Sequence, residues 1–258
     1  MTAPGPEGAM TGAGSGAYGT ATYGDRIADI YDDLYQFPTQ TEAAVDLLAE
    51  LAGGGPALEL GIGTGRLALP LAARDVTVLG IDAAEAMVAR LRAKPGGSDI
   101  EVTIGDFCAV PGETPCRVVY VAFNTFFALL SQDDQLRCFE RVAARLQTGG
   151  RFLMEAFVPD LARFDRGQRT SSSHVLTDAV ALEVSAHHPA SQRVDSAHVV
   201  IGETGTRIYP VQIRYCWPSE LDLMARLAGL TLEDRWADWQ RSPFTDDSGG
   251  HVSVWRRP

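Results

Sequence analysis

Between residues 57 and 157, short apolar runs alternate with longer segments whose apolar residues recur three or four positions apart. Short β-branched runs bounded by turn residues are typical of buried strands, and the longer spacing is typical of amphipathic helices. The pattern predicts helices at 66–73, 84–93 and 131–146, and strands at 57–62, 76–82, 100–106, 117–124 and 151–157. Strands that alternate with helices in this way indicate crossover units and a parallel sheet.

The N-terminal region has two different patterns. Residues 1–24 are rich in Gly, Ala, Ser, Thr and Pro, so we expect a largely disordered tail that buries too little apolar surface to order itself. One short amphipathic helix is predicted from Asp25 to Tyr35. Thr39 and Glu42 form a capping box for a second helix, which Gly53 ends.

The period of the pattern changes after Pro159. Val, Ile and Thr become frequent without helical spacing, which predicts three antiparallel strands at 174–187, 192–201 and 206–217. These form an inserted β-layer, at about 160–217, within one domain that covers 25–258. A helix capped by Ser219 follows, and then two strands, at 231–239 and 252–256, joined by a hairpin loop. The last strand should therefore run antiparallel to the others, and the fold class is α/β: a doubly wound, mostly parallel, seven-stranded sheet of Rossmann-like type.

Composition restricts the partners. The 22 Lys and Arg residues are outnumbered by 33 Asp and Glu residues, for a net charge of −11, which argues against broad binding to nucleic acid or anionic membranes. No run approaches the roughly 18 apolar residues that a membrane span needs. The N-terminus lacks a basic segment followed by an apolar one, so we expect a cytoplasmic protein.

Cysteines and histidines give no sign of a metal site. None of the four cysteines stands in a CxxC pair, so we expect reduced, mostly buried thiols. No HxxxH or HExxH pair is present. Any one of the five histidines could serve as a general base or simply be solvated, and both interpretations stay open for His174, His187, His188, His198 and His251.

The segment from Leu58 to Arg66 (LELGIGTGR) is a strand, a turn with three glycines and the start of a helix. Glycine permits positive φ and lets a ligand approach the backbone closely. The helix N-terminus behind the turn presents unpaired N–H groups, where a carboxylate or phosphate can bind. A tight connection that binds no ligand would have the same pattern.

Two acidic residues end the next two strands. Asp82 closes the second strand, where a carboxylate can accept both hydroxyls of a ribose. Asp106, followed by Phe107, closes the third, where a carboxylate can accept an adenine amino group and an aromatic ring can cover the base. Each acid alone is more often a helix cap or a turn residue.

Taken together, Glu59-x-Gly61-x-Gly63-x-Gly65-Arg66, Asp82 and Gly105-Asp106-Phe107 resemble the class I S-adenosylmethionine-dependent methyltransferases. The resemblance covers the chain from about residue 25 to its end, and the glycine spacing differs from the dinucleotide pattern G-x-G-x-x-G. It implies S-adenosylmethionine as cofactor and S-adenosylhomocysteine as product. The implied cofactor contacts are Glu59 at the amino group, Gly61 and Gly63 at the methionine part, Arg66 at its carboxylate, Asp82 at the ribose, Met87 on adenine, Asp106 and Phe107 at the adenine edge, and Phe123 close to the methionine.

The helix with Tyr31 and Tyr35 resembles the lid of a small-molecule subgroup that includes antibiotic-pathway sugar N-methyltransferases. There the tyrosines close over cofactor and acceptor, which makes Tyr31 the one catalytic candidate. Two tyrosines that only pack a helix onto the core would leave the same pattern. The resemblance also implies that the inserted strands roof the acceptor pocket and, in some members, contribute to a homodimer.

The acceptor side is predicted from aromatic and basic residues near the strand ends. Asn124 and Phe126 follow the fourth strand in place of a histidine expected in some sugar-modifying relatives, which suggests an apolar or aromatic wall. The hypothesis is that the pocket mouth is lined by Arg214, Tyr215, Trp217 and Arg241. The alternative for these four is structural pairing and core packing.

The sequence thus predicts methyl transfer from S-adenosylmethionine to a small molecule, in secondary metabolism. No strong base is evident, which favours a nitrogen or an acidic O or C nucleophile over an unactivated alcohol. A cyclase or binding protein on the same fold stays open, because fold does not decide function. A nicotinamide-dependent oxidoreductase fits less well, since the glycine spacing and the antiparallel last strand speak against it.

Overall fold

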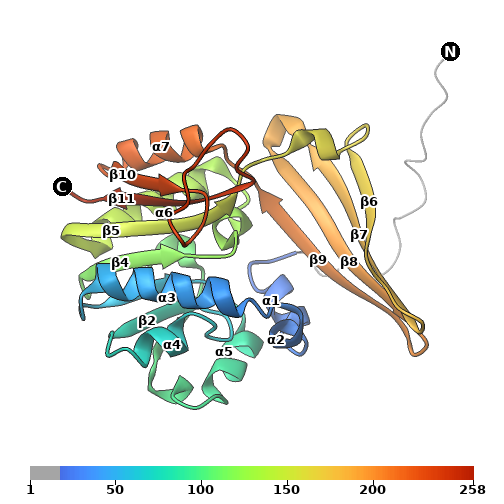
Figure 1. Ribbon diagram of the computed structural model, residues 1–258, viewed down its shortest axis with the longest axis horizontal. Coiled ribbons are helices and arrows are strands. Elements are labelled where there is room, and N and C mark those ends of the chain that lie inside the picture. The colour runs from blue at the N-terminus through green and yellow to red at the C-terminus, as the bar shows by residue number, and fades with distance from the viewer. Residues whose placement is uncertain (1–17) are drawn as a thin grey trace.

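Seven strands form the larger of two sheets in the computed structural model, which describes residues 18–258. Their order is β10-β11-β5-β4-β1-β2-β3 (Figure 1). β11 runs antiparallel to both β10 and β5, and the other pairs are parallel. The predicted fold class is confirmed. The strands are β1 (Ala57–Leu60), β2 (Val78–Asp82), β3 (Glu101–Ile104), β4 (Cys116–Val121), β5 (Leu146–Phe157), β10 (Thr231–Trp236) and β11 (Gly250–Arg256).

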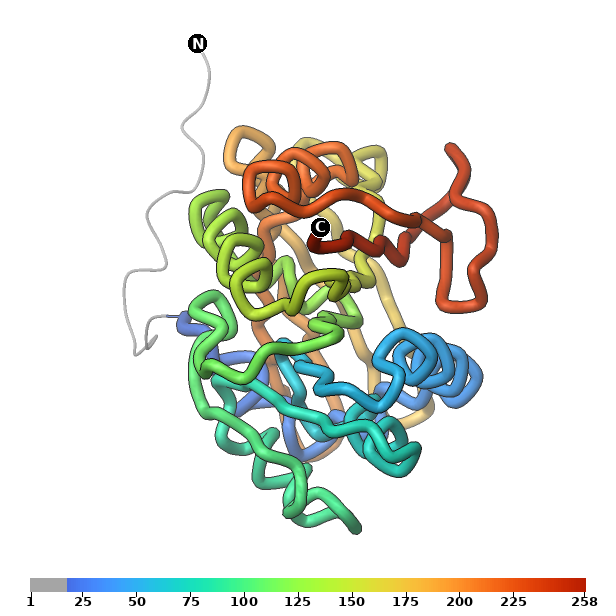
Figure 2. Tube along the Cα trace, turned by 90° about the vertical axis from the view of Figure 1, so that its left-hand side faces the viewer, coloured from blue at the N-terminus to red at the C-terminus, as the bar shows by residue number. Residues whose placement is uncertain are grey.

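Helices cover both faces of this sheet, and α3 and α6 flank it from opposite sides in Figure 2. Apolar residues of α3, α4 and α5 form one core, and those of α6 and α7 form the other. The helices are α1 (Thr22–Ile27), α2 (Tyr31–Leu34), α3 (Pro38–Ala52), α4 (Ala68–Ala72), α5 (Glu85–Arg92), α6 (Gln132–Arg145) and α7 (Pro218–Leu227).

Strand β4 shows how the sequence pattern produces this layering. Its residues from Val118 to Val121 are all fully buried, as expected for a strand covered on both faces. Val119 and Val121 pack in the α6 core, whereas Val118 and Tyr120 pack in the α3 core. Side chains alternate along a strand, so this short apolar run contributes to both cores at once.

The inserted layer has four antiparallel strands, and the prediction of three was wrong. They are β6 (Gln168–Val175), β7 (Ala179–His188), β8 (Arg193–Gly202) and β9 (Gly205–Arg214), paired in chain order. β6 has the sequence QRTSSSHV and is largely exposed. Its backbone pairs with β7 although its side chains show no apolar alternation, so the pattern gave no signal for it.

Three helix starts differ from the prediction. The helix expected from Asp25 to Tyr35 is two short helices, α1 and α2, separated by Ala28–Ile30. α3 begins at Pro38 with no side-chain cap, so the capping box at Thr39 was wrong, and α7 begins at Pro218 without a cap from Ser219. Proline suits the first helical turn because its missing N–H would have no partner there. Of the predicted N-terminal tail, residues 1–17 lie outside the described part.

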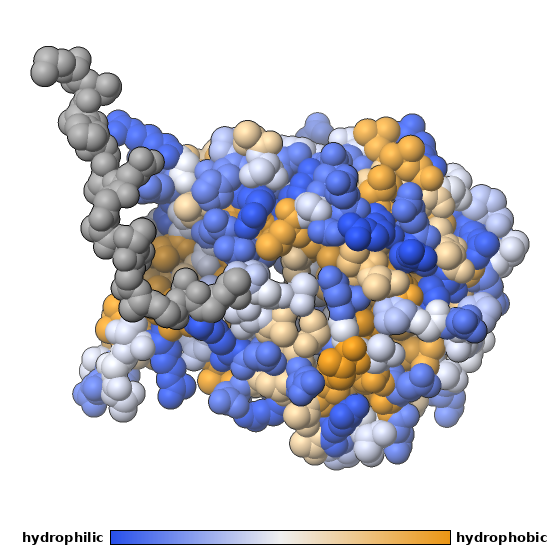
Figure 3. All heavy atoms as spheres, turned by 180° about the vertical axis from the view of Figure 1, so that it is seen from behind, coloured by the Kyte–Doolittle hydropathy of each residue, from blue (hydrophilic) through white to orange (hydrophobic). Residues whose placement is uncertain are grey.

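The four cysteines are buried and unpaired, as predicted. Among residues 18–258, no group of three or more His, Cys, Asp or Glu side chains is arranged to hold a metal ion. No helix in this described part has the length and apolar character that crossing a membrane requires. On the face seen in Figure 3, hydrophobic and hydrophilic residues are interspersed.

Candidate active site

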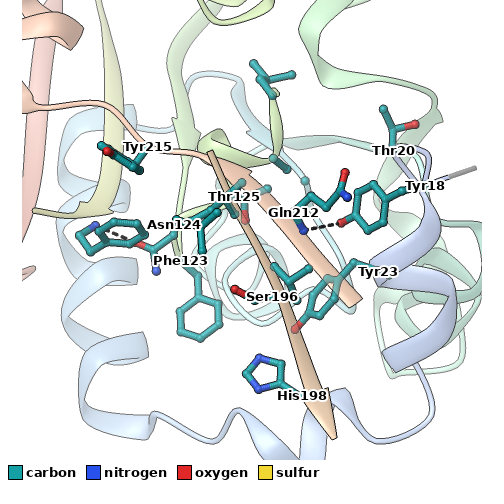
Figure 4. A pocket seen from close by; sticks show the side chains of 18 of the residues that line it. Tyr18, Thr20, Tyr23, Phe123, Asn124, Thr125, Ser196, His198, Gln212 and Tyr215 are labelled. Carbon is teal, nitrogen blue, oxygen red and sulfur yellow. Dashed lines mark hydrogen bonds between the residues drawn. The ribbon is translucent and has the colours of Figure 1, made fainter. Parts of the chain in front are cut away.

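A cavity of about 440 Å³ lies between the strand ends of the larger sheet and the inner face of the second sheet (Figure 4). Gly61 follows β1, Asp82 ends β2, and Phe123 follows β4, and all three line the cavity. The sheet order reverses between β1 and β4, which is where doubly wound sheets bind ligands. Side chains of the N-terminal segment, Tyr23 and Tyr31 among them, line another side.

The turn after β1 brings backbone to the cavity wall. Gly61 and Gly63 have φ values of +73° and +55°, which glycine adopts without steric cost. A Cβ at Gly61 would lie 2.5 Å from Cγ2 of Thr125, and one at Gly63 would lie 3.3 Å from Cε of Met87. Positive φ and these close contacts favour glycine at both positions, so bare backbone forms this part of the cavity wall.

Asp82 is held in place by two backbone amides. Its Oδ2 accepts a hydrogen bond of 2.7 Å from the N–H of Gly63, and its Oδ1 accepts one of 2.8 Å from the N–H of Ala84. Burial raises the pKa of this carboxyl above its ordinary value, against the effect of the two amides. Each oxygen keeps a lone pair, so the carboxylate can accept two hydroxyl donors from a ligand.

The residues predicted for an adenine ring also line the cavity. Met87, Asp106 and Phe107 belong to its wall. Asp106 accepts a hydrogen bond of 2.8 Å from the N–H of Cys108 through Oδ1, which orients its carboxylate. The structure therefore brings together, in one cavity, two of the strand-end carboxylates that the sequence singled out.

Glu59 and Arg66 lie behind the cavity wall rather than in it. The buried Glu59 carboxyl accepts a hydrogen bond of 3.0 Å from the hydroxyl of Tyr120, and burial raises its pKa to about 8. The Arg66 guanidinium donates to Oγ1 of Thr41 at 2.9 Å and stands 5.6 Å from the centre of the Phe123 ring. A buried carboxyl with one hydrogen bond would be stabilised as an anion by a cationic ligand group nearby.

The chain after β4 is locally strained. Phe123 and Asn124 have positive φ values of 55° and 64°, which are unfavourable for residues with a side chain. Two hydrogen bonds to β5 hold them: the N–H of Phe123 donates to Oε2 of Glu155, and Oδ1 of Asn124 accepts from the N–H of Phe157, both at 2.7 Å. This conformation directs Phe123 to the cavity, and the sequence carried no signal for the strain.

The predicted lid tyrosines form an aromatic cluster with Phe123. The rings of Tyr31 and Tyr35 lie 4.8 Å apart, and Tyr35 meets Phe123 edge-on at 5.0 Å. The hydroxyls of Tyr23 and Tyr35 are 3.0 Å apart. Burial raises the pKa of the Tyr31 hydroxyl, so it keeps its proton and is unsuited to act as a base.

Helix α2 is fastened to the glycine turn through Asp32. Its Oδ1 accepts a hydrogen bond of 2.6 Å from the hydroxyl of Thr64, and its Oδ2 lies 2.8 Å from Nζ of Lys94. Lys94 also donates to the carbonyl of Thr64 at 2.8 Å. These contacts position the tyrosines over the same turn that the resemblance assigns to the cofactor.

Four residues proposed for the acceptor side do not line the cavity. Arg214 is 5% exposed and pairs with Glu220 at 2.8 Å, so it stabilises the junction of β9 and α7. Trp217 is 40% exposed and precedes the first turn of α7. Arg241 pairs with Glu50 at 2.7 Å, and its guanidinium lies over the ring of Trp236. Phe126 is fully buried in the core beside α6.

Asn124, Tyr31, Tyr35 and Tyr215 do line the cavity. Several lining residues were missed. Tyr18 accepts a hydrogen bond of 3.2 Å from the N–H of Gln212 and so links the N-terminal segment to β9. Further missed residues lie on the inner face of the second sheet, where polar side chains at every second position were the available signal: Glu183, Ser185, Ser196 and His198.

These residues fit an adenosyl amino acid. The glycine turn brings bare backbone to the cavity wall, Asp82 has two lone pairs for a diol, and Asp106 with Phe107 and Met87 offers a carboxylate and an apolar wall. S-adenosylmethionine carries all of these groups.

Comparisons with known proteins agree with this geometry. Residues 57–150 match a family model described as a methyltransferase domain. The chain is 28% identical, over 207 residues, to the cypemycin N-terminal methyltransferase of a Streptomyces species, which covers 79% of this chain and 84% of the relative.

Two solved structures extend the similarity. The CcbJ methyltransferase of Streptomyces caelestis superimposes with a TM-score of 0.87 at 40% identity, over 93% of this chain and 99% of that one. CalS10 of Micromonospora echinaspora, an amino pentose methyltransferase involved in calicheamicin biosynthesis, was solved with S-adenosylmethionine bound. It superimposes with a TM-score of 0.65 at 20% identity, over 89% and 97% of the two chains, which shows a shared fold.

Proposed function

This chain belongs to the S-adenosylmethionine-dependent methyltransferases, and from that premise we propose that it methylates an amine nitrogen of a small molecule in secondary metabolism. When bound, S-adenosylmethionine supplies an activated methyl group: a bond forms from the acceptor nitrogen to the methyl carbon as the methyl–sulfur bond breaks, and S-adenosylhomocysteine is released. Asp82, Asp106 and the glycine turn would hold this cofactor.

The observation that carries the preference for an amine is the character of the acceptor wall. Glu183 places a carboxylate in the cavity, loosely paired with Arg163 at 3.3 Å and Arg169 at 3.4 Å. The rings of Tyr35 and Phe123 stand at the cavity edge, and aromatic faces attract cations. An ammonium-bearing acceptor suits both features better than a neutral alcohol does. The relative named as an N-terminal methyltransferase supports an amine acceptor as well.

The chain's own residues would contribute orientation and exclusion of water. The tyrosines on α1 and α2 cover the cavity, and Asp32 holds α2 against the glycine turn. Holding the nucleophile in line at about 3 Å supplies much of the acceleration of such a transfer. A closed, dry cavity also strengthens the attraction between charged groups inside it.

The test is transfer of a labelled methyl group from S-adenosylmethionine to matched pairs of acceptors. An amino pentose and a dipeptide amide are each offered beside the analogue in which hydroxyl replaces the amine. We expect label in the amines and not in the hydroxyl analogues. Preferential labelling of the hydroxyl analogues, by a protein that binds S-adenosylhomocysteine, would contradict N-methylation.

A further inference from the structure

Four polar residues form a strip on the inner face of the second sheet, and they are called the polar strip: Glu183 and Ser185 on β7, and Ser196 and His198 on β8. Residues two apart on a strand share a face. The register pairs Glu183 with His198 and Ser185 with Ser196, so the four side chains are cross-strand neighbours. All four line the cavity.

Hydrogen bonds occupy three members of the polar strip and leave the fourth free. Oγ of Ser196 donates to Oγ of Ser185 at 3.2 Å, and Oγ of Ser185 donates to Oε1 of Glu183 at 3.4 Å. Within residues 18–258, the His198 ring has no hydrogen-bond partner. In Figure 4 this ring projects from β8 into the part of the cavity where Tyr23 and Phe123 also point.

Other cavity groups are less suited to accept a proton. Burial raises the pKa of Tyr23 and of Tyr31, so both hydroxyls stay protonated. Asp82 and Asp106 accept backbone amides and stand where the adenosyl group would bind. Asp160 caps a short helix by accepting from the N–H of Ala162 at 3.1 Å. The unbonded imidazole of His198, by contrast, has a nitrogen lone pair available to accept a proton.

We propose that His198 is a catalytic residue that takes a proton from the acceptor's ammonium group before methyl transfer. This inference rests on the proposed N-methylation. The N–H bond of the ammonium breaks, its electron pair stays on nitrogen, and the proton passes to the imidazole, which becomes imidazolium. The neutral amine then has the lone pair that attack on the methyl carbon requires, and the imidazolium later gives its proton to water.

Charged and titratable groups surround His198. Glu183 is its cross-strand partner on β7, and the Glu183 carboxylate lies 3.3 Å from Arg163 and 3.4 Å from Arg169, so its charge is shared with two guanidinium groups. Tyr209 faces His198 across the register from β9, and Tyr23 of α1 lines the same cavity.

The experiment compares wild type with His198→Gln, using the amino pentose probe and labelled cofactor from about pH 7 to about pH 9.5. Loss of a general base typically costs 10²-fold or more, so we expect kcat/KM to fall by about 10²-fold near pH 7. The defect should shrink towards pH 9.5, because the amine then loses its proton to solvent. The affinity for S-adenosylhomocysteine should stay unchanged, and His174→Gln, an exposed histidine on β6, serves as the matched control.

A purely structural role would give a different result. Two results would overturn the role of His198 while wild type still methylates the amine. One is a loss of kcat/KM in His198→Gln that is equal at every pH, and the other is no loss of kcat/KM near pH 7. Methylation by wild type of the hydroxyl analogue alone would overturn the proposed function and this role together. Equal loss in His174→Gln would likewise overturn it, because that side chain lies away from the cavity.

Discussion

Replacing Asp82 with alanine tests the assignment of the strand-end carboxylates to the adenosyl group. Each carboxylate oxygen already accepts one backbone amide, from Gly63 at 2.7 Å and from Ala84 at 2.8 Å. One further lone pair on each oxygen remains for a ribose hydroxyl. The substitution therefore removes two hydrogen bonds to a charged acceptor from the complex with cofactor.

The magnitude follows from those two bonds. A hydrogen bond to a charged group contributes about 1.5–3 kcal/mol, so two of them amount to about 3–6 kcal/mol. A factor of ten corresponds to about 1.4 kcal/mol, so the Kd for S-adenosylhomocysteine should rise by roughly 10²- to 10⁴-fold. Asp82→Asn keeps one acceptor oxygen and should lie between alanine and wild type.

Isothermal titration with S-adenosylhomocysteine measures the affinity, and thermal unfolding followed by circular dichroism shows that the variants are folded. The loss of acceptors for two backbone amides should also lower the unfolding temperature. Asp46→Ala is the matched control, because Asp46 is exposed on α3 and, within the described residues 18–258, pairs with Arg74 alone, at 2.7 Å. A folded Asp82→Ala protein with the Kd of wild type would refute the assignment.

Three further predictions concern stability. Burial raises the pKa of Glu59 from 4.5 to about 8. Between these two pH values the folded protein keeps a proton that the unfolded chain has released. The free energy of unfolding should therefore fall as the pH rises from 4.5 to 8. Glu59→Gln should flatten that fall in urea unfolding without cofactor, and an unchanged slope would contradict the burial argument. Burial lowers the pKa of His251 from 6.5 to about 4, so the unfolded chain binds a proton in this range that the folded protein does not. The free energy of unfolding should therefore fall as the pH falls from 6.5 to 4. In the same assay, His251→Asn should reduce this loss of stability. Gly61→Ala should cost about 1–3 kcal/mol from positive φ and the contact with Cγ2 of Thr125. Adding Thr125→Ser removes Cγ2 and should restore only the part of the lost unfolding free energy that comes from this contact. If urea unfolding shows no recovery of stability in the double variant, the clash is not the cause.

The large sheet was predictable because its signals are local. Buried strands such as Val118–Val121 are apolar on both faces, and the glycine turn with Asp82 follows directly from the order of residues. The antiparallel last strand followed from a hairpin connection that leaves no room for a crossover. β6 was missed for the converse reason, since its polar side chains carry no alternation and only its backbone pairs with β7.

The acceptor side was much less predictable. Arg214 and Arg241 looked suitable by residue type and by nearness to strand ends, yet each is engaged in an ion pair, with Glu220 and with Glu50. Glu50 lies 191 positions from Arg241 along the chain, so no local pattern could indicate that pair. Phe126 was assigned to the wall, but the turn after β4 directs it into the core and Phe123 to the cavity.

The sequence by itself determined the sheet, the glycine turn and the carboxylates at the strand ends, because strand periodicity and turn chemistry depend on neighbouring residues. Only the tertiary structure decided which face of the second sheet meets the cavity. A strand's two faces differ by a shift of one residue, and long-range pairing selects between them. That choice turned Ser196 and His198 towards the cavity, and the docking of α2 through Asp32 brought the tyrosines over it.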